Sequence, residues 1–309
     1  MDVKTIWNLL SATFTKWTED HAQSLGAALA FYTVFSLAPI LLIVIAMAGL
    51  VFGQEAAEGQ IIGQIQGLVG DDSARAIQDM LAYARRPSTS LIATGVALVA
   101  MLFGATSVFA QVQDALNAIW GVKTKPGLGI VQILKGRFIS FVAVLGSGFL
   151  LLVSLVLNAA LAAVGHTLGS LLPAPESILQ AINFLLSFVV ITLLFAMIYK
   201  LIPDVSNKWK DVWVGAGMTS LLFTIGKFLI GLYLGKSEVG LAYGAAGSLI
   251  VILLWVYYTS QIFLFGAEFT AVYAASHGSQ LKPTLNAIPM HDGAPAVPDT
   301  NSPSPRKIA

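Results

Sequence analysis

The sequence predicts an all-α, polytopic membrane protein with six transmembrane helices, and three observations carry this prediction. Hydrophobic residues make up 56% of the 309 residues, charged residues make up 11%, and the mean hydropathy is +0.79, whereas soluble domains carry about 25% charged residues. Six apolar runs are each long enough to cross a bilayer core, which takes about 20 helical residues. Lys and Arg are also distributed unevenly between the loops on the two sides of these runs.

The apolar runs define a transmembrane domain over residues 25–275. Its expected spans are 25–52, 91–112, 138–164, 182–202, 212–234 and 243–273. The first span contains Pro39, and because proline removes a helical hydrogen bond we expect a kink near the middle of the membrane. The sixth span carries one formal charge, Glu268, in thirty-one residues.

The segments outside the spans show other patterns. Residues 1–24 place Ile6, Leu10 and Phe14 on one helical face, which predicts an amphipathic helix on the cytoplasmic membrane surface. A helix packed on the rest of the protein fits the same pattern. No cleavable signal peptide is visible before the first span.

The first loop and the tail complete the expected organisation. Two amphipathic patterns within residues 54–90 predict two short helices resting on the outer surface. Residues 276–309 hold six of the twelve prolines and few aromatic residues, which is typical of a disordered tail.

The distribution of Lys and Arg sets the expected orientation. The N-terminal arm, the second-to-third and fourth-to-fifth loops and the tail together hold twelve of these residues, and the other side holds four. Positive residues accumulate on the cytoplasmic side of inner-membrane proteins. We therefore expect both termini in the cytoplasm of a bacterium and residues 54–90 outside.

Polar side chains form stripes on three of the spans, at about the same cytoplasmic depth. The candidate residues are Tyr32 and Ser36 on the first span, Ser107, Gln111 and Asp114 at the end of the second, and Tyr257, Gln261 and Glu268 on the sixth. Their spacings of three, four and seven residues place each set on one helical face. If the faces converge, they line a cavity that is open to the cytoplasm and binds a substrate. Polar contacts that merely hold neighbouring helices together explain the same stripes.

Lys227 is the one basic residue within a span and is a further substrate-binding candidate. Its expected depth, about 20 Å from the inner boundary at 1.5 Å per residue, is too great for a direct pair with Glu268. Snorkelling of the ammonium toward the outer surface is the favoured alternative. If transport is coupled to protons, Glu268 is the best candidate for the carboxyl involved.

The sequence has no enzyme motif. The four histidines are scattered, there is no cysteine, and neither a phosphate-binding loop nor a nucleophile elbow is present. We therefore expect no catalytic residue, no metal and no cofactor. The net charge of +1 argues against a nucleic-acid partner, which leaves the lipid bilayer, a solute or lipid substrate and a second copy of the chain as partners.

Four separated motifs resemble the YihY/BrkB family of bacterial inner-membrane proteins. They are LAFYTVFSLAPILL at 29–42, LFGATSVFAQVQDALNAIWGV at 102–122, IPDVSNKWKDVWVGA at 202–216 and YGAAGSLIVILLWVYYTSQIFLFGAEFTAVY at 243–273. The resemblance covers roughly residues 20–275 and implies six transmembrane helices and a transporter-like role for lipids or small solutes. It implies no catalytic residues, and the family's older label, ribonuclease BN, is generally regarded as a misassignment.

Two function classes follow from these observations. The leading hypothesis is a transporter or exporter that loads a small organic solute or an amphipathic lipid from the cytoplasm. The alternative is a structural scaffold of the cell envelope, in which the polar stripes only join helices. A membrane-bound nuclease would need a cluster of metal ligands that the sequence does not contain.

Overall fold

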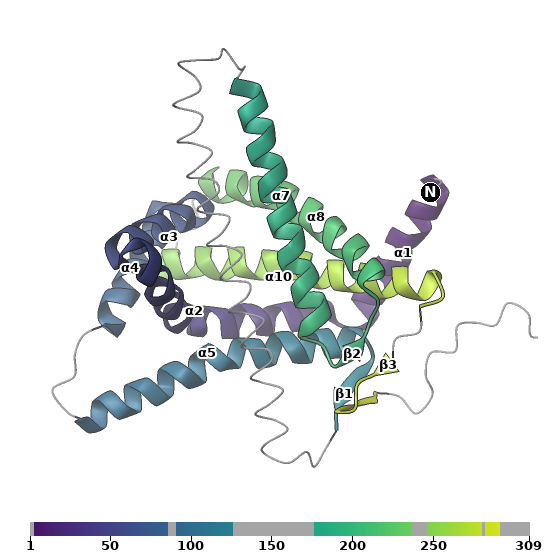
Figure 1. The fold of residues 1–309 in the computed structure, drawn as a ribbon, viewed down its shortest axis with the longest axis horizontal. Coiled ribbons are helices and arrows are strands. Elements are labelled where there is room, and N and C mark those ends of the chain that lie inside the picture. The colour runs from purple at the N-terminus through teal and green to yellow at the C-terminus, as the bar shows by residue number, and fades with distance from the viewer. Residues whose placement is uncertain (1–2, 86–90, 126–175, 237–245, 280–281, 291–309) are drawn as a thin grey trace, which may run out of the picture.

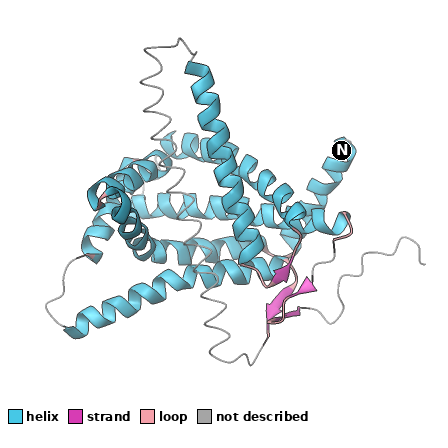
Figure 2. Ribbon diagram, in the orientation of Figure 1, coloured by secondary structure: helices cyan, strands magenta, loops and turns pink. Residues whose placement is uncertain are grey.

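The computed structural model describes residues 3–85, 91–125, 176–236, 246–279 and 282–290, which are mostly helical (Figures 1 and 2). Among them, four helices are long and apolar enough to cross a membrane. These are α2 (Ala22–Phe52), α7 (Glu176–Leu201), α8 (Trp209–Lys236) and α10 (Gly247–Ser276). They coincide with the expected first, fourth, fifth and sixth spans.

The second and third spans have different outcomes. Helix α5 (Leu91–Ile119) covers the whole expected second span and continues for seven residues beyond it. The expected third span, 138–164, lies outside the described residues. The count of six spans therefore stays a prediction, while a helical protein with several membrane-length helices is established.

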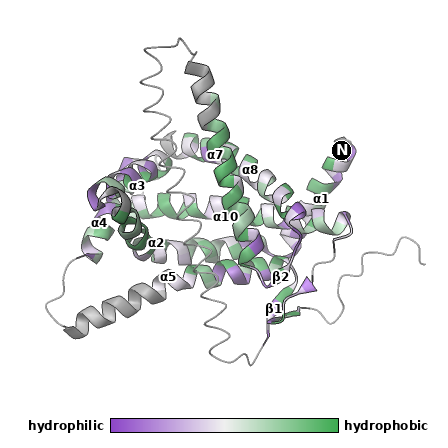
Figure 3. Cartoon of the chain, in the orientation of Figure 1, coloured by the Kyte–Doolittle hydropathy of each residue, from purple (hydrophilic) through white to green (hydrophobic). Residues whose placement is uncertain are grey.

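Helix α10 is the centre around which the other helices pack. It contacts α8 and α2, while α2 also packs against α5, and α7 packs against α8. Figure 1 shows α2, α5 and α10 side by side, with α7 crossing the group. Figure 3 shows apolar residues along the described part of α7 and many polar residues in α3 and α4.

Pro39 lies inside α2 without ending it, because the helix runs on to Phe52. Helix α5 approaches this point closely at Gly104, where an added Cβ would lie 3.4 Å from Pro39 Cγ. The absence of a side chain at Gly104 therefore allows the two helices to meet beside the proline.

Two helices occupy the loop between α2 and α5. Helix α3 (Gln54–Val69) and helix α4 (Asp71–Ala84) are joined at Gly70, whose φ is +83°. Ile77 and Leu81 of α4 are buried in one apolar cluster with Ala30 of α2 and Val256 of α10. Ile62 of α3 is buried in the same cluster, so both helices are packed into the bundle, and their location outside the membrane remains a prediction.

Helix α1 (Val3–Glu19) rests one face on the end of α10. Leu9 is buried in a small cluster with Phe269 and Tyr273, whereas Trp7 and Phe14 remain 70% and 60% exposed. The helix therefore combines the two alternatives that its pattern left open, a packed face and an exposed aromatic flank.

Short strands tie the segment after α10 to two inter-helix turns. β1 (Val122–Thr124) pairs with β4 (Ala287–Pro289), and β2 (Val205–Ser206) pairs with β3 (Lys282–Pro283), both antiparallel. Ala287 is buried in the main apolar cluster. The expectation of a disordered tail from residue 276 is therefore wrong for residues 282–290, while residues 291–309 lie outside the described part.

Candidate functional site

The structure joins two of the expected polar stripes through a pair of serines. Ser36 of α2 is buried and donates a hydrogen bond to the carbonyl oxygen of Gly104. The Oγ atom of Ser107 lies 3.2 Å from that of Ser36 and 2.8 Å from the same carbonyl. All three groups have partners, so this contact is a satisfied hydrogen-bond cluster between α2 and α5.

The other members of these two stripes are less enclosed. Tyr32 is 38% exposed. Gln111 is half-buried and Asp114 is exposed on α5. Convergence of all three stripes on one cavity therefore remains a prediction, since the structure brings Ser36 and Ser107 together and leaves Tyr32, Gln111 and Asp114 nearer the surface.

The stripe on α10 faces α2. Tyr257 packs on the cluster formed with α2 and α4. The Nε2 atom of Gln261 lies 3.4 Å from the carbonyl oxygen of Gln23, and it occupies the space beside Gly26, where an added Cβ would lie 2.0 Å away. The Oε1 atom of Gln261 is buried and has no hydrogen-bond partner among the described residues.

Glu268 is the most enclosed ionisable member of the candidate set. Its side chain is 1% exposed, and its Oε1 atom is buried without a hydrogen-bond partner among the described residues. The carboxyl of Asp20, in the turn between α1 and α2, lies close enough to act on that of Glu268 electrostatically. Sequence reasoning missed Asp20, because a single acidic residue in a turn belongs to no helical stripe.

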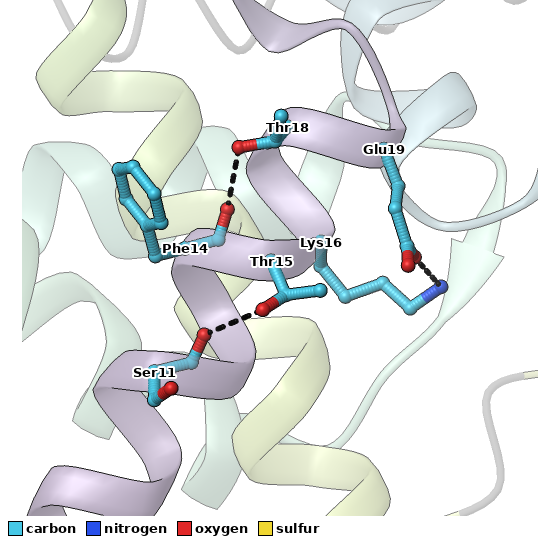
Figure 4. Close-up of polar contacts among 6 residues, drawn as sticks. All are labelled: Ser11, Phe14, Thr15, Lys16, Thr18 and Glu19. Carbon is cyan, nitrogen blue, oxygen red and sulfur yellow. Dashed lines mark hydrogen bonds and ion pairs between the residues drawn. The ribbon is translucent and has the colours of Figure 1, made fainter.

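Among the described residues, Lys16 is a cation whose charge acts on Glu268, but its ammonium is engaged elsewhere. Nζ of Lys16 lies 3.1 Å from the carboxylate of Glu19 on the same helix (Figure 4). This hydrogen bond raises the pKa of Lys16. The hydroxyls of Thr15 and Thr18 bond to carbonyls of α1 itself (Figure 4), so they are not directed at Glu268.

Lys227 lies apart from the other candidates. Its side chain is exposed on α8. The preceding residue, Gly226, packs against Tyr258 and Ile262 of α10, which places this part of α8 about 9 Å along the axis from Glu268 at 1.5 Å per residue. This separation agrees with the interpretation that Lys227 does not pair with Glu268.

A second polar cluster was not predicted from the sequence. One carboxylate oxygen of Asp204, in the turn between α7 and α8, accepts hydrogen bonds from Gln113 at 3.1 Å and from Asn117 at 3.0 Å. The backbone N–H of Asp204 donates to Asn117 Oδ1 at 2.8 Å. The four-residue spacing of Gln113 and Asn117 places both on one face of α5 and could have indicated this cluster. That face differs from the one that carries Ser107.

A third cluster lies between α7, α8 and α10. The hydroxyl of Tyr199 is 3.1 Å from Oγ1 of Thr219 and donates to the carbonyl oxygen of Phe263 at 2.7 Å. Both side chains are fully buried. Every group has a partner, so this cluster is suited to holding helices together.

The described part of the chain contains no group of three or more His, Cys, Asp or Glu residues placed to hold a metal ion. The candidate chemistry is therefore that of the carboxyls of Glu268 and Asp20 and of the unpaired amide oxygen of Gln261. We call the region formed by Asp20, Gln261 and Glu268 the α10 polar face.

Comparisons with known proteins point to a single family of membrane proteins. The model of the family described as "Virulence factor BrkB" matches residues 13–289. Proteins named "UPF0761 membrane protein" are similar along most of this chain. The one from Verminephrobacter eiseniae is 27% identical over 274 residues, covering 86% of this chain and 62% of that protein. The one from Rhodospirillum centenum is 26% identical over 259 residues, covering 83% of this chain and 55% of that protein.

A further relative, from Pseudomonas aeruginosa, is 28% identical over 258 residues, covering 82% of this chain and 59% of that protein. The chain spans about three-fifths of the length of these relatives. No solved structure matches it. The match over residues 13–289 takes in the four sequence motifs, the membrane-length helices and the strands after α10, and the chain belongs to the BrkB virulence-factor family, the YihY/BrkB family of membrane proteins.

Proposed function

We propose that the protein is a transporter or exporter of the bacterial inner membrane, with both termini in the cytoplasm. Its substrate is a small organic solute or an amphipathic lipid, which loads at the α10 polar face. The observation that carries the proposal is the buried carboxyl of Glu268 on a helix long enough to cross a membrane.

An ionisable side chain in such a helix is costly to bury and is therefore a functional candidate by default. Among the described residues, no ion pair with a basic side chain offsets this cost, and the carboxyl of Asp20 acts on Glu268 with a charge of the same sign. A group retained only for stability would be expected to have satisfied partners. Glu268 and Gln261 instead each keep a buried oxygen without a partner, which suits a face that binds something else.

The position of Glu268 along α10 supports loading from the cytoplasm. It follows Gly247, the first residue of the helix, by about 32 Å at 1.5 Å per residue. This distance is close to the thickness of the hydrocarbon core, about 30 Å. With the orientation expected from Lys and Arg, Glu268 is near the inner boundary, within reach of a cytoplasmic substrate.

A structural scaffold of the envelope is the second candidate. It is favoured by the satisfied contacts between helices, namely the Ser36–Ser107 pair and the Tyr199–Thr219 pair. Such contacts are typical of polar side chains that hold membrane helices together. They account for Ser36 and Ser107 but not for the unpaired oxygens of the α10 polar face.

Reconstituted protein tests the proposal. Proteoliposomes would be assayed for translocation of a fluorescent phospholipid between leaflets and for flux of a panel of labelled organic acids and amines. We expect Glu268→Gln and Gln261→Ala to lower the transport rate at least tenfold per folded protein, while Glu55→Gln, an acidic residue of the first turn of α3, leaves it unchanged.

Two outcomes contradict the proposal. Equal transport rates in wild type, Glu268→Gln and Gln261→Ala at equal folded amounts would exclude the α10 polar face as the site. Wild-type protein that moves none of the probes, combined with a loss of thermal stability in these variants, would favour the scaffold.

A further inference from the structure

Three segments that are far apart in the sequence bring lysines to one end of the helical bundle. Lysines occur in and beside β1, in the turn between α7 and α8, and in β3. The pairing of β2 with β3 sets Lys282 opposite Ser206, two residues before Lys208. β1 is held to the same turn, because the hydroxyl of Thr124 donates to the carboxylate of Asp204 at 3.4 Å. Figure 1 shows β1, β2 and β3 gathered beside the end of α7.

The segment after α10 connects these parts through its backbone. The N–H of Thr284 donates to the carbonyl oxygen of Asp204 at 2.9 Å, and the N–H of Lys125 donates to the carbonyl oxygen of Asn286 at 2.9 Å. The turn between α7 and α8 and the strand after α5 are therefore joined by one stretch of chain. We call the lysines collected in this way the basic end; they are Lys123, Lys125, Lys200, Lys208, Lys210 and Lys282.

The basic end carries positive charge that no neighbouring carboxylate cancels. Residues 122–125, 200–211 and 282–290 contain six Lys and two Asp, and therefore have a formal charge of +4. None of these lysines forms an ion pair with another described residue. Asp204 accepts hydrogen bonds from the amides of Gln113 and Asn117. Asp211 is buried in the first turn of α8, where the helix dipole favours a carboxylate.

The basic end lies where two membrane-length helices leave the apolar part of the bundle. Helix α7 ends at Leu201 and α8 begins at Trp209, and both are long and apolar enough to cross a membrane. Trp209 and Trp213, one turn apart on α8, are 48% and 43% exposed. Nζ of Lys200 lies 5.7 Å from the centre of the Trp209 ring. Because tryptophan is enriched at the level of the lipid headgroups, the lysines are placed within reach of these headgroups.

We infer that the basic end binds the headgroup of an anionic phospholipid in the adjacent leaflet. The lysine ammonium groups donate hydrogen bonds to the phosphate oxygens and neutralise their charge, while Trp209 and Trp213 lie against the lipid at the membrane boundary. Clusters of four to eight Lys or Arg beside membrane helices recognise anionic lipids in this way. A soluble acidic protein or a nucleic acid would use the positive charge but not the exposed tryptophans. Binding of this lipid does not depend on whether the protein transports a substrate.

The expected affinity can be estimated for each lysine. A Lys near an anionic membrane surface changes the apparent affinity about fivefold, and two independent lysines change it about 25-fold. Salt weakens such an attraction, because charges are screened over about 8 Å at physiological ionic strength and over about 3 Å at 1 M.

A lipid titration of the purified full chain in an uncharged detergent tests the inference. The midpoint temperature of unfolding would be followed against the mole fraction of phosphatidylglycerol, and separately against phosphatidylcholine with the same acyl chains. The apparent affinity is read from the mole fraction that gives half of the change in midpoint. We expect phosphatidylglycerol to raise the midpoint at a lower mole fraction than phosphatidylcholine does.

The decisive variant combines Lys208→Gln with Lys282→Gln. Both side chains are exposed, so the midpoint without added lipid should be unchanged. The apparent affinity for phosphatidylglycerol should fall about 25-fold, while that for phosphatidylcholine should stay the same. The matched control combines Lys4→Gln with Arg75→Gln, which removes the same charge from exposed positions on α1 and α4, and it should retain the affinity of the unaltered chain.

The unaltered chain provides a second measurement that does not depend on any variant. Raising the salt concentration from about 0.1 M to about 1 M should weaken the binding of phosphatidylglycerol and leave that of phosphatidylcholine unchanged. An affinity for phosphatidylglycerol that salt does not alter would contradict binding through the lysines.

Other results also overturn the inference. An equal loss of affinity in the two double variants would mean that the overall charge of the chain attracts the lipid. An equal effect of phosphatidylcholine and phosphatidylglycerol would mean that the acyl chains bind and the headgroup charge does not. Inorganic phosphate that produces the whole change in midpoint without lipid would identify a site for free phosphate. Polyglutamate or RNA with the same lysine-dependent effect would identify a soluble acidic partner.

Discussion

The contact between α8 and α10 at Gly266 allows a quantitative prediction. A Cβ at this position would lie 1.9 Å from Oγ1 of Thr219 and 2.7 Å from the hydroxyl of Tyr199. Neither neighbour is free to move away, because both side chains are fully buried and bonded to each other and to backbone carbonyls. Gly266→Ala therefore forces the helices apart or breaks this cluster.

The expected cost combines three effects. Overpacking a tight contact costs about 1–3 kcal/mol, and leaving a buried hydroxyl unpaired costs about 1–3 kcal/mol more. Alanine recovers about 1 kcal/mol relative to glycine through its better helix propensity. We expect a net loss of about 3 kcal/mol in the free energy of unfolding.

The assay compares unfolding in mixed micelles, followed by circular dichroism during titration with a denaturing detergent. Gly217→Ala on α8 is the matched control, because a Cβ there meets nothing within 4 Å and should be neutral or stabilising by up to about 1 kcal/mol. Combining Gly266→Ala with Thr219→Ala removes the closest contact and should cost less than the sum of the two single changes. Equal stability of Gly266→Ala and Gly217→Ala would refute the close approach of α8 and α10.

Two further predictions concern the turn between α7 and α8 and the strands after α10. Asn117→Ala removes two hydrogen bonds to the turn between α7 and α8 and should lower the free energy of unfolding by about 1–3 kcal/mol. In the same denaturant titration, the control Ser24→Ala changes an exposed residue of α2 and should leave this free energy unaltered. Truncation after residue 279 removes β3 and β4 and should lower the midpoint temperature of thermal unfolding in detergent. Truncation after residue 290 keeps both strands and should leave this temperature unchanged. Equal midpoints for the two truncated proteins would mean that the strands do not stabilise the fold.

The helices were predictable because a membrane-length helix is determined by local composition. The first and sixth spans were placed within four residues of α2 and α10 at each end. The start of α7 at Glu176 was missed by six residues, since Glu176, Ser177 and Gln180 interrupt the apolar run there. Apolar runs report where a helix can be buried in lipid, and they do not report how far it continues into polar surroundings.

The short strands could not be predicted in the same way. β3 has two residues and β4 has three, too few to show the alternation that identifies a strand. Their partners, Val205 and Val122, lie about 80 and 170 residues earlier in the chain. The proline content of this segment indicated disorder, and pairing with distant turns outweighed it.

The polar stripes show what helical spacing does and does not determine. Spacing identified Ser36 and Ser107 as members of helix faces, and the structure joins them. It did not indicate that Gln261 would meet Gly26 or that Asp20 would lie near Glu268, because the choice of neighbour depends on how the helices pack. Asn117 was missed for the related reason that its partner, Asp204, is in a turn.

The two sides of α10 differ in a way that assigns them different roles. Gly266 and Thr270 face α8, where the hydroxyls of Tyr199, Thr219 and Thr270 all have hydrogen-bond partners. On the opposite side of the helix, about 160° away at 100° per residue, Gln261 and Glu268 each keep an unpaired buried oxygen. Separating α10 from α7 breaks the buried hydrogen bond that Tyr199 donates to the carbonyl oxygen of Phe263, whereas separating it from α1 lets the carboxyl of Glu268 gain water as a partner. Movement that exposes a binding face should therefore occur on the α1 side, while α7, α8 and α10 move together as its support.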